Sequence, residues 1–422
     1  MPGRFRWTVV FLLFAVTIIN YVDRSSIAFA AHLIQAEFDL SSTRLGLIMG
    51  AFGIGYIIST LFGGIGVDRL GSKAVLACTL ALWSFAIGWT GAATGFVMLY
   101  AARTVLGLAE GPSFPVMEAT ITKWLPPEER ATALSGALVA VPVALAIGSP
   151  LVSTLIDAFG WRAMFFTLCV LGLSWLPFWL IFFSNTPSKS IRISEQEQAF
   201  IEDKQRQAGE HFERHVPSSA EWRRLLTNPT LLANYWAYFV FGYFIFFFMS
   251  WMPEYLRKSY DLELSQVGYF AFLPWALASV LLLFFGPWSD RILRRTNSLR
   301  KARSFQIAGT QLFAAIAILP ASMIDNLYVA MTSITLAVGS SLAANAAYYA
   351  VITDLTPRSA GTAMGIMTIW FAAAGFLAPV ITGYALDLTG SFQPAFWLLS
   401  LLAASSVVGV FFFHHPDRHK QS

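Results

Sequence analysis

Four charged residues lie inside two long apolar segments of the sequence. Asp23 and Arg24 fall in the segment 5–31, and Arg103 and Glu110 fall in the segment 100–115. A charge inside a membrane helix costs about 2.5–3.5 kcal/mol even on a lenient scale. A helix would place Arg103 and Glu110 on one face, about two turns apart. We therefore expect the four charges to line one water-accessible cavity and to bind an anion in exchange for a proton.

The composition predicts a polytopic membrane protein. The chain is 56% hydrophobic and only 12% charged, with a mean hydropathy of +0.60, whereas soluble domains are about 25% charged. The net charge of +4 gives no indication of a nucleic-acid partner, because in such a protein the location of the charges matters more than their sum. Cys78 and Cys169 sit within apolar runs and are interpreted as core residues without a disulfide or metal role.

Twelve apolar runs have the length of about 20 residues that a helix needs to span the hydrocarbon of a bilayer. We therefore expect an all-α integral membrane fold with twelve transmembrane helices in two six-helix bundles. The runs lie near 7–31, 46–66, 74–92, 96–118, 131–156, 162–183, 230–252, 266–286, 304–322, 327–350, 361–386 and 393–413. A long polar stretch divides them into an N-terminal bundle, a cytoplasmic linker with surface helices, and a C-terminal bundle, at 1–184, 185–229 and 230–422.

The distribution of Lys and Arg predicts the orientation. If both termini are cytoplasmic, most of the 28 Lys and Arg residues fall in inner segments, and the outer loops hold only Arg44, Arg162, Arg257 and Lys258. Such a bias is typical of inner loops. The first run lacks a cleavage site for a signal peptidase, so we interpret it as a retained helix.

The two halves of the chain share a repeat. Gly64–Arg69 and Gly286–Arg291 both read G-x-x-x-D-R at the inner end of the second helix of a half, and the segments 127–160 and 357–390 also match in their Pro, Asp and Gly residues. Repeats of this kind place a binding site at the interface of the halves near mid-membrane.

The run Gly64–Lys73 resembles the loop signature of the major facilitator superfamily. In that superfamily the signature serves the inner gate, so the resemblance implies conformational roles for Asp68, Arg69, Asp290 and Arg291. Glu118, one turn from the inner end of the fourth helix, is assigned to the same gate.

The pattern N-Y-x-D-R in the first helix, with R-x-x-x-G-x-x-E-G-P-x-F-P in the fourth, resembles the anion:cation symporter family of that superfamily over the whole chain. The family includes bacterial galactonate, glucarate and hexuronate transporters and the sialin-type transporters. The resemblance implies that Arg24 and Tyr56 contact the substrate, that Asp23 pairs with Arg103 and takes part in proton coupling, and that Glu110 is the principal protonation site.

Physical chemistry supports these roles. A guanidinium binds a carboxylate through a two-point fork and stays charged at any working pH. Desolvation favours a neutral glutamic acid and a nearby arginine favours the carboxylate, so their competition can set when Glu110 binds a proton. The GPSFP run after Glu110 either opens backbone groups to the cavity or only kinks the helix. A purely structural ion-pair network also remains open, although apolar residues would hold a bundle at lower cost.

The sequence departs from the sugar-acid members at two positions. Those members carry amide side chains where this chain has Val141 and Ala372. The departure points to a less hydroxylated or partly apolar acid, because an unpaired buried polar group is costly, while a sugar acid stays open as the substrate. In the tenth helix, Asn345 and Tyr348 share a face and are the expected second-half contacts. Asn345 could equally serve as an interhelical hydrogen-bonding residue.

The sequence thus predicts a secondary transporter, not an enzyme, that couples inward transport of a small organic anion to protons by alternating access. No cofactor, metal or nucleotide loop is expected, and the predicted setting is a monomer in the inner membrane bilayer. Three alternatives remain: export of an anion or drug by proton antiport, sodium-coupled uptake, and a receptor or channel on the same fold.

Overall fold

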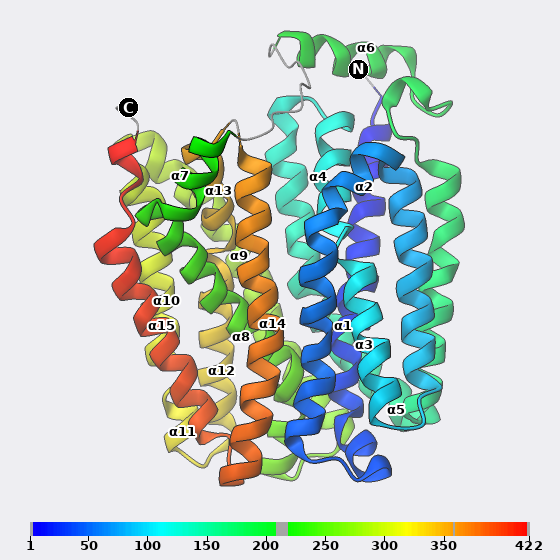
Figure 1. The fold of residues 1–422 in the computed structure, drawn as a ribbon, viewed down its shortest axis with the longest axis vertical. Helices are drawn as coiled ribbons and strands as arrows, with labels where there is room; N and C mark the ends of the chain where they lie inside the picture. The colour runs from blue at the N-terminus through cyan, green and yellow to red at the C-terminus, as the bar shows by residue number, and fades with distance from the viewer. Residues whose placement is uncertain (1–2, 208–217, 358, 420–422) are drawn as a thin grey trace.

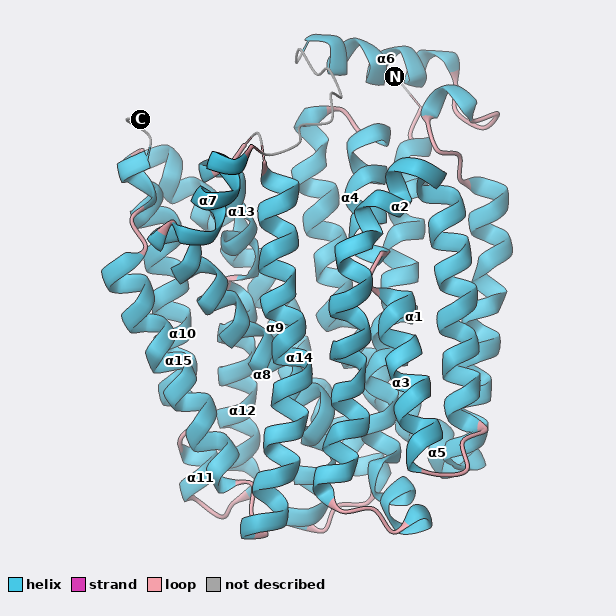
Figure 2. Cartoon of the chain, in the orientation of Figure 1, coloured by secondary structure: helices cyan, strands magenta, loops and turns pink. Residues whose placement is uncertain are grey.

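The apolar runs form helices that pack side by side, as the computed structural model of the chain shows (Figure 1). The structure describes residues 3–207, 218–357 and 359–419, and these residues form helices joined by loops and turns, without a strand (Figure 2). Ten helices are long and apolar enough to cross a membrane. These ten segments already include two in α2 (Ser42–Gly91). α5 (Pro127–Phe182) is counted once but contains two spans, and α3 (Phe96–Glu110) together with α4 (Ser113–Trp124) forms another, so the described residues contain twelve transmembrane helices.

The first half consists of five helical elements. They are α1 (Phe5–Phe38), α2 (Ser42–Gly91), α3 (Phe96–Glu110), α4 (Ser113–Trp124) and α5 (Pro127–Phe182). α2 and α5, with 50 and 56 residues, are each interrupted at a glycine with a φ of 81°, Gly71 and Gly160. L-residues with a side chain rarely adopt such a φ. Each glycine therefore marks the turn between two successive spans.

The second half begins after a connecting segment that contains η1 (Pro187–Lys189), α6 (Glu195–Gln207) and α7 (Ser219–Thr227). Its elements are α8 (Pro229–Tyr260), α9 (Leu264–Thr296), η2 (Arg300–Ser304), α10 (Phe305–Ala317), α11 (Pro320–Met323), α12 (Leu327–Ala343), α13 (Asn345–Leu355), α14 (Ala360–Thr389), α15 (Gln393–Phe413) and η3 (Pro416–His419). Residues 208–217 of the expected linker lie outside the described residues.

Both chain termini lie at the same end of the molecule, which we call the terminal end; the other end is the opposite end (Figure 1). α6 crosses the terminal end and is bonded to the first half. Buried Glu197 of α6 accepts hydrogen bonds from the backbone N–H groups of Phe5 and Arg6, at 3.0 and 3.1 Å. The guanidinium of Arg6 bridges Glu197 and Glu129, with N–O distances of 2.9 and 2.8 Å. The surface helix expected in this segment is therefore anchored to α1 and α5.

The two halves pack tightly along α2 and α14 at the opposite end. A Cβ atom added to Gly46 would lie 2.5 Å from the carbonyl oxygen of Pro379, and one added to Gly53 would lie 2.5 Å from the backbone nitrogen of Phe376. Only glycine allows backbones to approach so closely. We call this contact the α2–α14 seam.

Toward the terminal end the same two helices are no longer in such contact. A Cβ atom added to Gly64 of α2, or to Gly361 or Gly365 of α14, would meet no atom within 4 Å. Phe62 of α2 is 64% exposed. Along α2 and α14, the structure is therefore closed at the opposite end and open at the terminal end.

In each half, a side chain that follows the last span caps the N-terminus of the third span, so the internal repeat includes this contact. After α5, the side chain of Asn185 accepts a hydrogen bond from the backbone N–H of Lys73, at 2.8 Å. After α15, the carboxylate of Asp417 accepts from the backbone N–H groups of Leu299 and Arg300, at 2.7 and 3.1 Å. First-turn N–H groups have no acceptor within their own helix, so the chain segment that ends each half serves the third span of that half.

The C-terminal tail, residues 414–419, yields a prediction about pH. His414 is fully buried, and its Nδ1 lies 2.7 Å from the hydroxyl oxygen of Ser304. Burial lowers the pKa of His414 to about 3, and His415 and Arg300 contribute to the lowering. A detached tail would restore a pKa of about 6.5. The contact of the tail with the second half is thus most stable above pH 6.5. As the pH falls, the free energy that holds the tail in place decreases, by about 2 kcal/mol at pH 5.

Hydrogen–deuterium exchange, corrected for intrinsic rates, should therefore show about thirtyfold more opening of the amides of residues 300–304 at pH 5 than at pH 7.5. In a His414→Gln variant, which cannot gain the proton, this pH difference should vanish. Equal protection of the wild-type amides at both pH values would contradict the assignment.

Candidate functional site

The centre of the first half holds a buried ion pair between Arg24 of α1 and Glu110 of α3. Nε and Nη2 of Arg24 both donate to one carboxylate oxygen, Oε2 of Glu110, at 2.9 and 2.7 Å. Arg24 is 2% exposed and Glu110 is 0% exposed. Oε1 of Glu110 and Nη1 of Arg24 have no hydrogen-bond partner among the described residues. The pair is thus desolvated but leaves one donor and one acceptor unused.

Aromatic rings surround the guanidinium of Arg24. Its Cζ atom lies 4.4 Å from the ring centroids of Tyr21 and Phe52, and 5.1 Å from that of Tyr56. A cation over a ring face is attracted by about 0.5–2 kcal/mol. Asn20, one helical turn before Arg24, accepts a further hydrogen bond from Nη2 at 3.2 Å. These contacts fix the plane of the guanidinium and exclude water from it.

Glycines allow α2 and α3 to pack closely beside the ion pair. A Cβ atom added to Gly55 of α2 would collide with the carbonyl oxygen of Thr104, and one added to Gly107 of α3 would collide with that of Phe52. α2 and α3 can therefore pack backbone to backbone. The residues between α3 and α4, Gly111 and Pro112, keep right-handed helical dihedral angles, so the GPSFP run forms a kink and not an unwound segment.

Arg103 and Asp23 are also buried, but they are not paired with each other as the resemblance implies. Nη2 of Arg103 donates to the backbone carbonyl oxygen of Arg24 at 3.2 Å, and its Nε and Nη1 have no partner among the described residues. Oδ2 of Asp23 is likewise without a partner there. Because successive helical residues point about 100° apart, Asp23 and Arg24 cannot both face α3, and Arg24 takes that direction.

The structure does not place the four charged groups in the water-accessible cavity that the sequence predicted. Each of their residues is at most 2% exposed, because the ring cluster packs over Arg24 on one side and α2 and α3 are in close contact on the other. The four groups are therefore out of contact with solvent, although α2 and α14 are separated toward the terminal end. A cavity of about 20 Å³, lined in part by Asn20, Tyr21 and Ser113, lies beside the ion pair.

The second half contributes amide and phenol groups instead of charges. The hydroxyl of Tyr348 accepts a hydrogen bond from Nε2 of Gln311 at 3.0 Å, and the backbone carbonyl of Tyr348 accepts one from Asn234 at 3.2 Å. Oδ1 of Asn345, which is 9% exposed, has no partner among the described residues. Tyr348 is therefore held in place, while Asn345 has a free acceptor.

Aromatic rings connect the ion pair to Tyr348 across the two halves. Phe52, beside Arg24, lies 6.3 Å from Phe246 of α8, and Phe246 lies 5.0 Å from Phe371 of α14. Tyr238 then lies 5.4 Å from Phe371 and 5.3 Å from Tyr348, between ring centroids. Sequence reasoning missed these phenylalanines; Phe52 could have been found because it precedes Tyr56 by one helical turn.

The residues predicted to serve the gate lie toward the terminal ends of α2, α4 and α9. Asp68, Arg69, Asp290 and Arg291 are exposed, and Glu118 of α4 is half-buried. Asp290 has a buried basic partner in η2.

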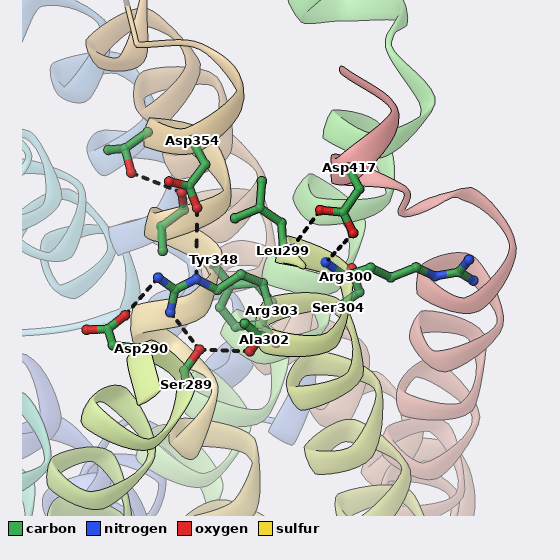
Figure 3. A network of polar contacts seen from close by, with 12 residues as sticks. Ser289, Asp290, Leu299, Arg300, Ala302, Arg303, Ser304, Tyr348, Asp354 and Asp417 are labelled. Carbon is green, nitrogen blue, oxygen red and sulfur yellow. Dashed lines mark hydrogen bonds and ion pairs between the residues drawn. The ribbon is translucent and has the colours of Figure 1, made fainter. Parts of the chain in front are cut away.

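That partner, Arg303, was not singled out in the sequence. It donates to Oδ1 of Asp290 at 2.8 Å and to the hydroxyl of Ser289 at 2.6 Å, and it lies 3.9 Å from a carboxylate oxygen of Asp354 (Figure 3). Arg303 thus joins α9, η2 and α13, three elements that meet at the terminal end of the second half.

Comparisons with known proteins identify the class of protein. A family model described as the Major Facilitator Superfamily matches residues 13–379. The chain belongs to this superfamily of membrane transporters, whose members are not enzymes.

Named relatives narrow the class. The chain is 31% identical over 413 residues to a hexuronate transporter of Bacillus subtilis, covering 97% of this chain and 94% of the relative. It is also 31% identical to a probable sulfoacetate transporter of Cupriavidus necator, covering 93% and 90%. Among solved structures, an inward-facing, occupied bacterial homologue of the human lysosomal transporter Spinster has the same fold, with a TM-score of 0.74 at 17% identity, covering 99% and 98%.

The ion pair allows a test of its energetics. Breaking a buried pair by removing one partner costs about 3–5 kcal/mol, whereas replacing both with apolar residues is often neutral. Glu110→Leu should therefore lower the melting temperature in detergent markedly. The double variant Arg24→Met with Glu110→Leu should recover most of that loss. A double variant less stable than Glu110→Leu alone would show that the pair is not the electrostatic unit of the site.

Proposed function

We propose that this transporter carries a small organic anion together with protons. The observation that supports this proposal is that one desolvated guanidinium, that of Arg24, is occupied by a carboxylate of the protein itself, Glu110. A substrate carboxylate would need the same N–H groups. The anion and Glu110 therefore compete for Arg24, and protonation of Glu110 decides the competition.

The energetics of burial convert this competition into coupling. A buried charge without a partner costs several kcal/mol. Two states avoid that cost at Arg24: the empty carrier with ionised Glu110 on Arg24, and the loaded carrier with the anion on Arg24 and Glu110 protonated. The two half-loaded states leave a charge unmatched. Only the empty and the fully loaded carrier should therefore change conformation, which is the requirement for symport.

Alternating access would arise from rocking of the two halves. The α2–α14 seam closes the opposite end while α2 and α14 separate toward the terminal end. The bias of Lys and Arg supports a cytoplasmic terminal end, so this geometry would correspond to a carrier open to the cytoplasm. Asp23, with a free carboxylate oxygen, would be a second proton-binding group, and a monomer in a bacterial inner membrane would be the working unit.

The proposed substrate is a carboxylate with few hydroxyl groups. Hydroxyl-rich acids need buried hydrogen-bonding partners, because an unpaired buried polar group is costly. Val141 and Ala372 replace amide positions of the sugar-acid transporters, and both lie buried in the apolar core. Among the named relatives, one is a probable sulfoacetate transporter, and sulfoacetate has no alcohol hydroxyl group. An acid of this size with a second anionic group could place that group against Arg103, which lies beside Arg24.

Glu110→Gln tests the coupling. The amide keeps a hydrogen-bond acceptor for Arg24 but cannot change its charge, so substrate should bind without a proton. In proteoliposomes, proton-driven accumulation should be lost while exchange of labelled for unlabelled anion continues. Glu37→Gln, which alters a carboxylate paired with Arg162 near the opposite end, serves as the control and should retain both activities. Uphill uptake by Glu110→Gln at the wild-type rate would remove Glu110 from the mechanism.

A panel of labelled acids tests the substrate class. Under an inward proton gradient we expect hydroxyl-free acids with two anionic groups to accumulate at least tenfold better than hexuronates, which corresponds to about 1.4 kcal/mol of discrimination. An uncoupler should abolish the accumulation. Preferential uptake of hexuronates would show that Val141 and Ala372 do not mark a less polar substrate.

A further inference from the structure

A carboxylate of the second half caps a helix of the first half at the opposite end. α2 begins at Ser42, and Oδ1 of Asp387, in the last turn of α14, accepts a hydrogen bond from the backbone N–H of Ser42 at 2.9 Å. Oδ2 of Asp387 accepts from the backbone N–H of Thr43 at 2.8 Å. Both N–H groups lack an acceptor within α2. One carboxylate thus satisfies two amides that belong to the other half.

This cap closes the end of the α2–α14 seam. Gly383, one turn before Asp387, allows α14 to approach the backbone of Ser42 so closely that an added Cβ would collide with it. A carboxylate at a helix N-terminus is also attracted by the helix dipole. The hydrogen bonds and the dipole act only while α14 touches the start of α2, so their free energy belongs to the conformation closed at this end.

The internal repeat does not reproduce the cap in the other seam. Asp157 of α5 is the repeat counterpart of Asp387, but it is exposed and makes no hydrogen bond to α9 in the described structure. α9 is capped within its own half, because Glu263 and Gln266 form a reciprocal capping box at its start. The repeat alone therefore does not explain the position of Asp387.

We propose that Asp387 is the latch of the opposite end: it holds the two halves together there and must release Ser42 and Thr43 before that end opens. This inference rests on the proposed alternating access, but not on the identity of the anion or on proton coupling. Asp387 does not take part in the ion pair between Arg24 and Glu110, because it lies at the surface, at the end of α14.

Distance measurements between spin labels test the latch. Labels at Thr94 and Tyr328, exposed residues of the first and second half, would report opening in a background with Cys78→Ser and Cys169→Ala. Loss of a helix cap costs about 1 kcal/mol, a roughly fivefold change in a two-state ratio. Without substrate in nanodiscs, Asp387→Ala should therefore raise the long-distance population about fivefold, and Asp387→Asn, which keeps one acceptor, should raise it less.

Two further variants separate the latch from a general effect of charge. Ser42→Pro removes one donor N–H at the first helical position, where proline is compatible with a helix, and should shift the distances in the same direction. Asp157→Asn changes the same charge at the repeat counterpart and should leave them unchanged. Unaltered distances in Asp387→Ala, or an equal shift in Asp157→Asn, would overturn the proposal.

A failure of the latch proposal can be distinguished from a failure of the proposed proton-coupled transport. If the distances shift as expected but wild-type uptake is not driven by protons, the latch stands and the coupling is wrong. If the uptake is proton-driven but the distances of all Asp387 variants match those of the wild type, the coupling stands and the latch is wrong.

Discussion

The ion pair between Arg24 and Glu110 is the interaction on which the first half depends. The guanidinium of Arg24 is buried, and Glu110 is the one carboxylate bonded to it among the described residues. Beside the pair, α2 and α3 pack backbone to backbone, which Gly55 and Gly107 permit. The ring of Phe52 covers the guanidinium and shields it from water. The glycines and rings of this region thus enclose the ion pair, where the loss of one partner would be costly.

The two halves share their scaffold of spans and helix caps, but they differ in the residues that form the candidate site. Both halves use a residue after their last span, Asn185 or Asp417, to cap the start of their third span. The cluster of four buried charges around Arg24, in contrast, belongs to the first half, while the second half supplies neutral groups such as Gln311 and Tyr348 near it. Duplication can explain the shared scaffold, whereas the proposed proton coupling would need only one site.

Much of the fold could be predicted because hydrophobic length is a local signal. The apolar runs predicted the membrane spans. The glycine breaks inside α2 and α5 lie between runs that the sequence analysis predicts to be separate spans. The pairing of the charges could not be predicted in this way. Asp23 and Arg24 are neighbours in sequence, and only the direction of each side chain decides that Arg24 meets Glu110 while Arg103 turns to a backbone carbonyl. Contacts such as Asp387 with Ser42 depend on how the halves meet, which no local pattern contains.

The site and the α2–α14 seam share one turn of α2. Phe52 lies 4.4 Å from the guanidinium of Arg24, and the next residue, Gly53, packs against the backbone of Phe376 in α14. Because close-packed backbones cannot deform gradually, a change in the occupant of Arg24 that moves the ring of Phe52 acts directly on the contact between the halves. The same α14 ends at Asp387, on the start of α2. In the proposed cycle, the exchange of Glu110 for substrate at Arg24 and the closure of the opposite end would therefore be joined through α2 and α14.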